Sequence, residues 1–216
     1  MFDFLKKIFS NHQRLKSKSK LTDLAYDYLF NEPPADEWVS LDLELTGLNA
    51  KTHHILSVGA VKIKQTNKSF VIDTSDMLSI ICHPPIMPDT NSIVIHGLRP
   101  IDVESGMNYD EMLDKLLPFI GSRPIVGFCT SMDMAFINTL AKSKLGTKLP
   151  NALIDVANLD QKLRQKINKN SDIPIDKRHL NELLIAHKIP ILPAHDSMND
   201  ALMTAMLFCH LKSQLD

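Results

Sequence analysis

The stretch WVSLDLELTGL, at residues 38–48, alternates apolar and polar side chains in the manner of a β-strand. Because successive side chains of a strand point to opposite faces, the aliphatic residues share one face, and Ser40, Asp42 and Glu44 share the other. Two carboxylates this close repel each other unless a cation neutralises them, and oxygen ligands favour hard ions such as Mg²⁺ or Mn²⁺. An Asp-x-Glu pair on the wet face of an antiparallel strand is usually just solvated. The pair therefore predicts a metal site only together with other residues.

The rest of the chain continues with strands and then alternates helices and strands. Apolar runs predict strands at Ile55–Lys64, Met77–Cys82 and Pro124–Phe128. Residues Ala152–Val156 fit either a further strand or the start of a helix that carries Leu159 and Leu163. Apolar spacing predicts helices at Ser92–Leu98, Tyr109–Ile120, Met132–Lys144, Arg178–His187 and Asp196–Leu211. This succession indicates an α/β protein whose sheet has mixed strand directions.

An N-terminal appendage, residues 1–36, is predicted to precede a main domain at residues 37–216. It contains a predicted helix at Leu21–Phe30, which the following pair of prolines ends. Residues 1–20 hold six Lys or Arg and one acid, whereas the remainder of the chain carries a net charge of −6. The basic arm is either a solvated tail or a contact for phosphate backbones or anionic membranes. The acidic body argues against broad electrostatic binding of nucleic acid, but it is compatible with holding divalent cations.

Composition favours a soluble, cytoplasmic protein. With 44% hydrophobic and 23% charged residues the chain can bury a core. No apolar run approaches the roughly 18 residues that a membrane span needs, and the N-terminus lacks the continuous apolar region of a secretory signal. Cys82, Cys129 and Cys209 are too far apart for a disulfide framework or a zinc spacing, which fits a reducing compartment.

Three further residues strengthen the case for a metal site. Asp196 or Ser197 can cap the last helix, which places His195 on a loop and Asp200 in the first turns of that helix. From there both side chains can reach one pocket. Asp133 opens a helix just after the fourth predicted strand, where the helix dipole also favours an acid for purely structural reasons. Each signal has an ordinary structural explanation, so the prediction depends on their joint occurrence.

Taken together, these motifs resemble those of the DEDDh exonucleases, and among them the bacterial DnaQ-like proteins related to the epsilon proofreading subunit. The first family motif is similar to Asp42–Leu48 followed by Ile55–Val61, and Ser92–Leu98 looks like a helix beside the family's site. The second motif is similar to Ile125–Gly127 leading to Asp133, and the third to His195–Ala201. The resemblance covers residues 37–212 and leaves the N-terminal appendage outside it.

The resemblance implies a ribonuclease-H-like fold, with a five-stranded mixed sheet flanked by helices. It implies that Asp42, Glu44 and Asp200 bind one Mg²⁺ or Mn²⁺ ion. A second ion would lie between Asp42 and Asp133, and His195 would take the proton from the attacking water. The residues implied to surround the 3′-terminal nucleotide are Thr46, Gly47, Leu48 and His96.

The chain departs from the family pattern at the second motif. Family members commonly have His-Asn and a Phe at positions where this chain has Phe128-Cys129 and Met132. The usual Asn lies near the terminal nucleotide, so its replacement bears on substrate preference and rate. The implied metal-binding set is complete.

The implied function is a metal-dependent 3′→5′ exonuclease that releases nucleoside 5′-monophosphates from single-stranded or 3′ ends, with DNA favoured over RNA. One alternative is a proofreading subunit of a DNA polymerase, although the short sequence after Leu211 is expected to leave no tether for one. Another is an inactive relic that only binds nucleic acid or a protein, and retention of all the key residues weighs against it. His53 and His54, in the turn after the first strand, are expected to be exposed to solvent.

Overall fold

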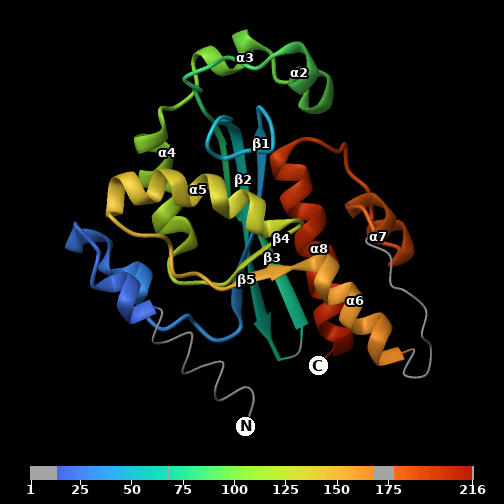
Figure 1. Cartoon of the computed structure of the whole chain (residues 1–216). Coiled ribbons are helices and arrows are strands. Elements are labelled where there is room, and N and C mark those ends of the chain that lie inside the picture. Colours follow the sequence, from blue (N-terminus) through green and yellow to red (C-terminus); the bar gives the residue numbers. More distant parts are fainter. Residues whose placement is uncertain (1–13, 68, 168–177, 216) are drawn as a thin grey trace.

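A five-stranded sheet forms the centre of the computed structural model, which describes residues 14–67, 69–167 and 178–215 (Figure 1). The strands are β1 (Glu37–Leu45), β2 (Ile55–Thr66), β3 (Ser69–Ile81), β4 (Ile125–Gly127) and β5 (Leu153–Asp155), in the spatial order β3-β2-β1-β4-β5. β1 pairs antiparallel with β2 and β2 with β3, whereas β4 runs parallel to β1 and β5 parallel to β4. The predicted five-stranded mixed sheet is confirmed.

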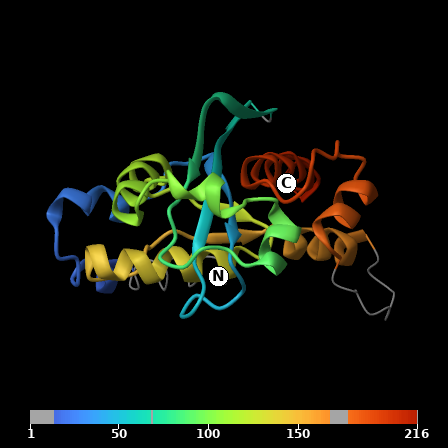
Figure 2. The same ribbon diagram turned by 90° about the horizontal axis from the view of Figure 1, so that it is seen from above.

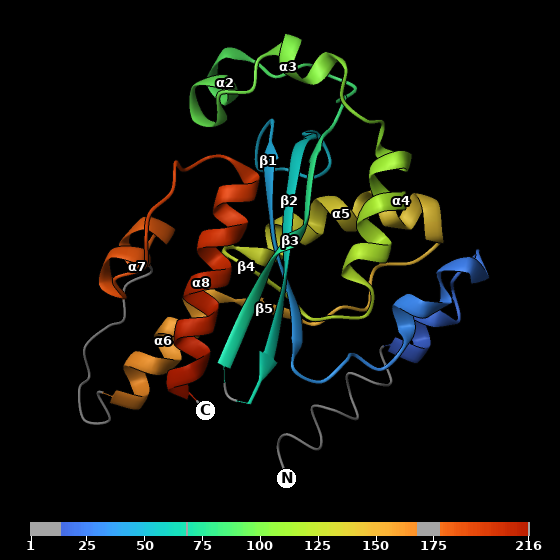
Figure 3. The same ribbon diagram turned by 180° about the vertical axis from the view of Figure 1, so that it is seen from behind.

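Helices cover both faces of the sheet (Figures 2 and 3). On one face lie α4 (Tyr109–Ile120) and α5 (Thr130–Leu145), and on the other lie α6 (Val156–Ile167), α7 (Leu180–Ala186) and α8 (Ser197–Leu215). Two short helices, α2 (Thr90–His96) and the unpredicted α3 (Pro100–Glu104), lie beyond the carboxyl end of β1. Within the described part of the chain, no helix combines the length and apolar character that a membrane crossing requires.

Strand β1 is covered on both faces because it lies between the two helix layers. Val39 and Leu41 are fully buried in the core that α4 and α5 share. On the opposite face Ser40 is also fully buried, and its Oγ donates a hydrogen bond to the Ala201 carbonyl of α8 (2.8 Å). The polar face of β1 is therefore packed against α8 instead of being open to water.

Strand β3 begins at Ser69, eight residues before the predicted start at Met77. Its first half is paired with β2, from Thr66 opposite Ser69 onward, but few of its side chains are buried. The reason is that β3 is an edge strand. Phe70 and Ile72 are only partly buried where they pack against the core beside Trp38, so the apolar alternation that marks this half is short.

The described part of the N-terminal appendage packs against the main domain. Residues 14–18 are helical, and the helix predicted at Leu21–Phe30 is a 3₁₀ helix, η1, at Leu24–Phe30. The Asp23 side chain caps η1 by accepting a hydrogen bond from the Ala25 N–H (2.9 Å). Leu29 and Phe30 join the core beneath α4 and α5. The first part of the predicted basic arm, residues 1–13, lies outside the described residues, so the role of this arm and the boundary at residue 36 stay predictions.

Candidate active site

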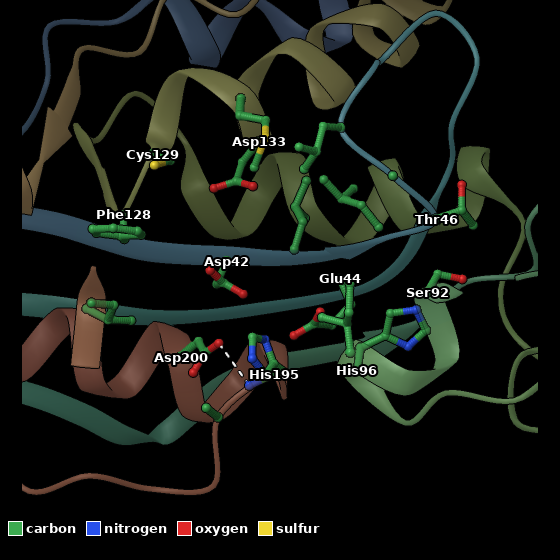
Figure 4. A pocket seen from close by; sticks show the side chains of 18 of the residues that line it. Asp42, Glu44, Thr46, Ser92, His96, Phe128, Cys129, Asp133, His195 and Asp200 are labelled. Carbon is green, nitrogen blue, oxygen red and sulfur yellow. Dashed lines mark hydrogen bonds between the residues drawn. The ribbon is translucent and has the colours of Figure 1, made fainter. Parts of the chain in front are cut away.

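A pocket of about 710 Å³ opens at the carboxyl end of β1 (Figure 4). Its walls come from β1 and the loop after it, from α2, from the starts of α5 and α7, and from the loop before α8. The nine residues predicted to act in catalysis, metal binding or substrate binding all line it: Asp42, Glu44, Thr46, Gly47, Leu48, His96, Asp133, His195 and Asp200. The fold thus brings the whole predicted site together from distant parts of the sequence.

Asp42, Glu44 and Asp200 form the centre of the site, where one carboxylate oxygen from each lies within 4.8 Å of the others. Glu44 is buried, and this burial, followed by the charges of Asp200 and Asp196, raises its pKa to about 8. Burial also raises the pKa of Asp42 well above its usual range, and the charge of Asp133 adds to the effect. Without a neutralising cation these carboxylates favour the protonated form, so the cluster attracts positive charge.

Asp133 faces the cluster from the far side of Asp42 as seen from Asp200 (Figure 4). It lies in the first turn of α5 and is 3% exposed. Its Oδ2 has no hydrogen-bond partner among the described residues. Burial, followed by the charges of Glu44 and Asp155, raises the pKa of this carboxyl. A buried carboxylate without a partner is unfavourable unless a ligand compensates it.

The donor set fits hard divalent cations. Besides Asp133 Oδ2, Asp200 Oδ1 is also buried without a hydrogen-bond partner in the described parts of the chain. No Lys or Arg is among the described residues that line the pocket, so no such cation there balances the four carboxylates. Carboxylate oxygens of this kind suit Mg²⁺ or Mn²⁺, and a cation would satisfy the buried oxygens.

Asp200 reaches the cluster because α8 begins directly against β2. Gly59 of β2 pairs with Asp42 of β1, and a Cβ at Gly59 would lie 2.2 Å from the Ser197 carbonyl oxygen. Only a residue without a side chain leaves room for this contact. Next to it, Ser57 Oγ donates a hydrogen bond to Ser197 Oγ (2.9 Å). The first turn of α8 is thereby fixed beside Asp42.

The loop before α8 places His195 beside Asp200. Asp196 caps α8, as predicted, because its Oδ1 accepts hydrogen bonds from the main-chain N–H groups of Met198 and Asn199. His195 adopts a φ of +62° and donates its main-chain N–H to Asp200 Oδ2 (3.2 Å). Its exposed imidazole lies beside the carboxylates in the pocket (Figure 4). The ring is accessible to water, and its main chain is tied to a candidate metal ligand.

A second wall of the pocket consists of the loop at residues 46–48 and His96. Leu48 is 77% exposed, whereas His96, at the end of α2, is 8% exposed. His96 Nδ1 accepts a hydrogen bond from the Leu98 N–H (3.0 Å), which leaves the proton of the neutral ring on Nε2. This Nε2 is buried and makes no hydrogen bond to any described residue. Burial, followed by the charge of His195, lowers the pKa of His96, which favours the neutral ring.

The residues that depart from the family pattern also line the pocket. Phe128 and Met132 bring apolar groups, and Cys129, with a φ of +56°, occupies the N-cap position of α5 between them. None of these three residues brings an amide to the pocket, whose amides come from Asn91 and Asn181. Residues 179–181, at the start of α7, line the pocket too, although the sequence did not single them out. No motif or spacing links α7 to the acidic residues, so only the folded chain shows this contact.

His53 and His54 are partly buried, so their predicted exposure to solvent is wrong. They hold the loop that follows β1. The Thr46 N–H donates to the His54 carbonyl (3.0 Å), and the His54 N–H donates to Thr46 Oγ1 (2.9 Å). A Cβ on Gly47 would lie 2.3 Å from Cδ2 of the His53 ring. A loop that folds back on itself can bury polar rings that its local sequence marks as exposed.

Comparison with known proteins agrees with this site. The family model RNase_T, described as an exonuclease family, matches residues 39–208. The chain is 28% identical over 179 residues to the PolC-type DNA polymerase III of Caldanaerobacter subterraneus subsp. tengcongensis, and 29% over 197 residues to that of Halalkalibacterium halodurans. These alignments cover 83% and 88% of this chain but 12% and 13% of the relatives, so the chain spans about an eighth of their length.

Solved structures share the fold. Exonuclease I of E. coli, in a complex with single-stranded DNA, matches with a TM-score of 0.65 and 15% identity over 83% of this chain and 41% of its own. Cell-death related nuclease 4 matches with a TM-score of 0.68 and 15% identity, covering 83% of this chain and 64% of its own. The predicted ribonuclease-H-like fold is confirmed. Since the family model covers most of the chain, this protein belongs to the RNase T exonuclease family, the DnaQ-like group of DEDD nucleases.

Proposed function

We propose that this chain is a metal-dependent 3′→5′ exonuclease that releases nucleoside 5′-monophosphates from the 3′ ends of nucleic acid. The observation that carries the proposal is the convergence of four carboxylates, from β1, α5 and α8, in one pocket where their pKa values are raised. A cluster of this kind is unfavourable for folding on its own and becomes favourable when it holds cations. Membership of an exonuclease family supports the same reaction.

Two Mg²⁺ or Mn²⁺ ions fit this cluster in the proposal. Asp42, Glu44 and Asp200 would hold one ion, and Asp42 with Asp133 would hold the second. When bound, such ions activate a water molecule for in-line attack and stabilise the leaving 3′-oxygen. The chain's own part is to keep the oxygens in place: β1 carries Asp42 and Glu44, and the first turns of α5 and α8 carry the other two.

His195 is the proposed general base. Its imidazole is exposed in the pocket, beside the carboxylates, where a water molecule can reach it. The hydrogen bond from its main chain to Asp200 ties this loop to the acidic cluster. Histidine is the commonest general base, and catalysis of this kind contributes about 10²–10⁴-fold to a rate.

The proposed substrate is a single-stranded 3′ end, with DNA favoured over RNA. The loop at residues 46–48 and His96 would surround the terminal nucleotide, with the exposed Leu48 side chain against a base. Gly47 would allow the backbone to approach the nucleotide closely. Exonuclease I was solved with single-stranded DNA and the curated relatives are DNA polymerases, which supports the preference for DNA.

A second candidate is a proofreading exonuclease that works with a DNA polymerase. The similarity to PolC-type polymerases favours it, because this chain aligns with a segment of those much longer proteins. An inactive relic that only binds nucleic acid or a protein is the least supported candidate. All four carboxylates and His195 are present and line one pocket.

Digestion of end-labelled oligonucleotides tests the proposal. Single-stranded DNA and RNA, labelled at the 3′ or the 5′ end, are incubated with Mg²⁺, Mn²⁺ or EDTA, with Asp42→Ala and His195→Ala alongside. Immediate release of a labelled mononucleotide from the 3′ end, and a stepwise ladder from the 5′ label, are expected only with metal and only for the wild-type chain. Full activity in either variant contradicts the mechanism. Adding a purified polymerase with a mismatched primer separates the stand-alone enzyme from the proofreading candidate.

A further inference from the structure

We infer that His53 is a positioning residue. Its imidazole packs against Gly47 and holds the loop at residues 46–48 in the position that contacts the 3′-terminal nucleotide. The inference rests on the proposed exonuclease function, because it assigns that loop to the nucleotide. His53 does not line the pocket of the acidic cluster, so it would act through the loop and not on the reacting atoms.

The contact between Gly47 and His53 explains why a glycine stands in this loop. A Cβ at Gly47 would lie 2.3, 2.5 and 2.8 Å from Cδ2, Nε2 and Cγ of His53, so its three nearest neighbours all belong to one ring. Gly47 is not among the glycines with positive φ, so the backbone conformation alone does not demand glycine. The imidazole occupies the space that any other side chain would need.

Hydrogen bonds within the loop hold the ring in this position. The His53 N–H donates to the Asn49 carbonyl (2.9 Å), and the ring Nδ1 is 3.1 Å from Thr52 Oγ1. On the other side, Thr46 and His54 exchange two hydrogen bonds. These bonds fix the backbone on both sides of His53, and the contact of Nδ1 with Thr52 is the one of them that holds the ring itself.

His53 also lies near α2, which forms another wall of the pocket. Asp89 caps α2 by accepting a hydrogen bond from the Ser92 N–H (2.9 Å). The hydrogen bonds from Ser92 lower the pKa of Asp89, and the charge of His53 lowers it further. The imidazole is therefore within electrostatic range of the residue that caps α2, the helix that carries His96.

Loss of the His53 ring is expected to change KM more than kcat. Removing the ring leaves the acidic cluster and His195 in place, but it takes the support away from the loop that would bind the nucleotide. Loss of positioning on this side weakens substrate binding more than the chemical step. His53→Ala is expected to raise KM for a short single strand roughly 10-fold while kcat changes less than about 3-fold, since small displacements of positioning groups cost one to two orders of magnitude. His53→Phe, which keeps a flat ring, is expected to preserve most of the affinity.

A second-site rescue tests the inference. Gly47→Ala places a methyl group into the His53 ring and is expected to raise KM strongly. Combining it with His53→Ala removes all three clashing atoms. The double variant is therefore expected to bind substrate better than Gly47→Ala alone. Gly59→Ala serves as the matched control, because its methyl group would meet the Ser197 backbone instead, so His53→Ala should not rescue it.

The measurements are kcat and KM on a 5′-labelled single-stranded DNA 12-mer, with the thermal unfolding midpoint of every variant. Recovery of KM in the Gly47→Ala/His53→Ala variant, without recovery in the Gly59→Ala pair, supports the inference. A double variant no better than Gly47→Ala, or a His53→Ala variant with unchanged KM, overturns it. If Gly47→Ala does not fold, the KM values of the two His53 variants test the inference: a raised KM for His53→Ala and a nearly unchanged KM for His53→Phe support it. A wild-type chain that degrades no oligonucleotide overturns the proposed function as well, whereas an active wild type without rescue overturns the inference alone.

Discussion

Gly59 of β2 and Ser197 of α8 are in direct backbone contact, so close that a Cβ on Gly59 would lie 2.2 Å from the Ser197 carbonyl oxygen and 2.4 Å from the Met198 nitrogen. Gly59 is also the ladder partner of Asp42. The same glycine therefore contacts both the strand that carries two of the carboxylates and the helix that carries a third. The geometry of the acidic cluster depends on this contact.

Gly59→Ala is expected to lower kcat about 100-fold, because the added methyl group pushes the first turn of α8, and with it Asp200, away from Asp42. The measurement is steady-state hydrolysis of single-stranded DNA by the folded variant. Gly146→Ala is the matched control: its Cβ would lie 2.6 Å from Thr22 Cγ2 at a φ of +75°, at the far end of α5. This control is expected to lose stability but to keep kcat. A folded Gly59→Ala protein with wild-type kcat would contradict the account.

Asp133→Asn is expected to abolish hydrolysis and yet to stabilise the metal-free protein. Burial and neighbouring charges raise the pKa of Asp133, so the fold disfavours its charged form, and the neutral amide removes that cost. The gain in the free energy of unfolding in EDTA is expected to be roughly 1–3 kcal/mol. Asp114→Asn is the control, since Asp114 pairs with Lys144 near the surface and no gain is expected there. A destabilised Asp133→Asn protein in EDTA would show that the carboxylate has a purely structural role.

The stability of the metal-free protein is expected to fall as the pH rises from about 4.5 to about 8. Glu44 has a usual pKa of 4.5, and the fold raises it to about 8, so the folded chain binds this proton more tightly than the unfolded chain. The favourable contribution is complete below 4.5 and is lost as the pH passes through 8. Mg²⁺ competes with protons for the carboxylates of the cluster. It should therefore raise the unfolding midpoint more at pH 8, where fewer protons compete, than at pH 5. Thermal unfolding with Mg²⁺ or EDTA at both values measures this, and Glu44→Gln should flatten the dependence. Equal stabilisation by Mg²⁺ at the two pH values would refute the assignment.

Asp160→Ala is expected to lower the free energy of unfolding by about 2–4 kcal/mol, because it removes a buried carboxylate that accepts two side-chain hydrogen bonds, each worth roughly 1–3 kcal/mol. Asp160 is fully buried and accepts hydrogen bonds from Arg164 Nε (2.7 Å) and His187 Nε2 (2.8 Å), which joins α6 to the end of α7. Denaturant unfolding measures the loss. Asp102→Ala, which breaks an exposed pair with Arg99, should have little effect. Similar small changes in the free energy of unfolding of both variants would show that Asp160 does not hold α7 in place.

Much of the site could be predicted because its residues lie on regular elements. Alternation along β1 is enough to put Asp42 and Glu44 on one face, and the cap at Asp196 is enough to separate a His195 loop from an Asp200 helix. The resemblance to a known family then connected these segments, and the fold brings them into one pocket. The metal-binding and catalytic roles of these residues stay predictions.

Features that depend on contacts between elements could not be predicted. The first half of β3 pairs with β2 at the sheet edge and packs only Phe70 and Ile72 against the core, so its apolar pattern is too short to reveal it. The burial of His53 follows from a loop that folds back onto Gly47. The contribution of residues 179–181 to the pocket depends on where α7 packs. In each case the deciding interaction joins residues whose local sequence carries no sign of it.

Calorimetric titration of the wild-type chain and of Asp42→Asn with Mn²⁺, in the presence of a deoxynucleoside 5′-monophosphate, tests most directly whether the four carboxylates form one cation site. Asp42 is the ligand that the two proposed ions share, and its pKa is raised well above its usual range by burial and by the nearby acids. The account predicts saturable binding of two ions to the wild-type chain, with release of protons at pH 7, and loss of this binding in Asp42→Asn. Binding by the wild-type chain that is no stronger than by Asp42→Asn would contradict it.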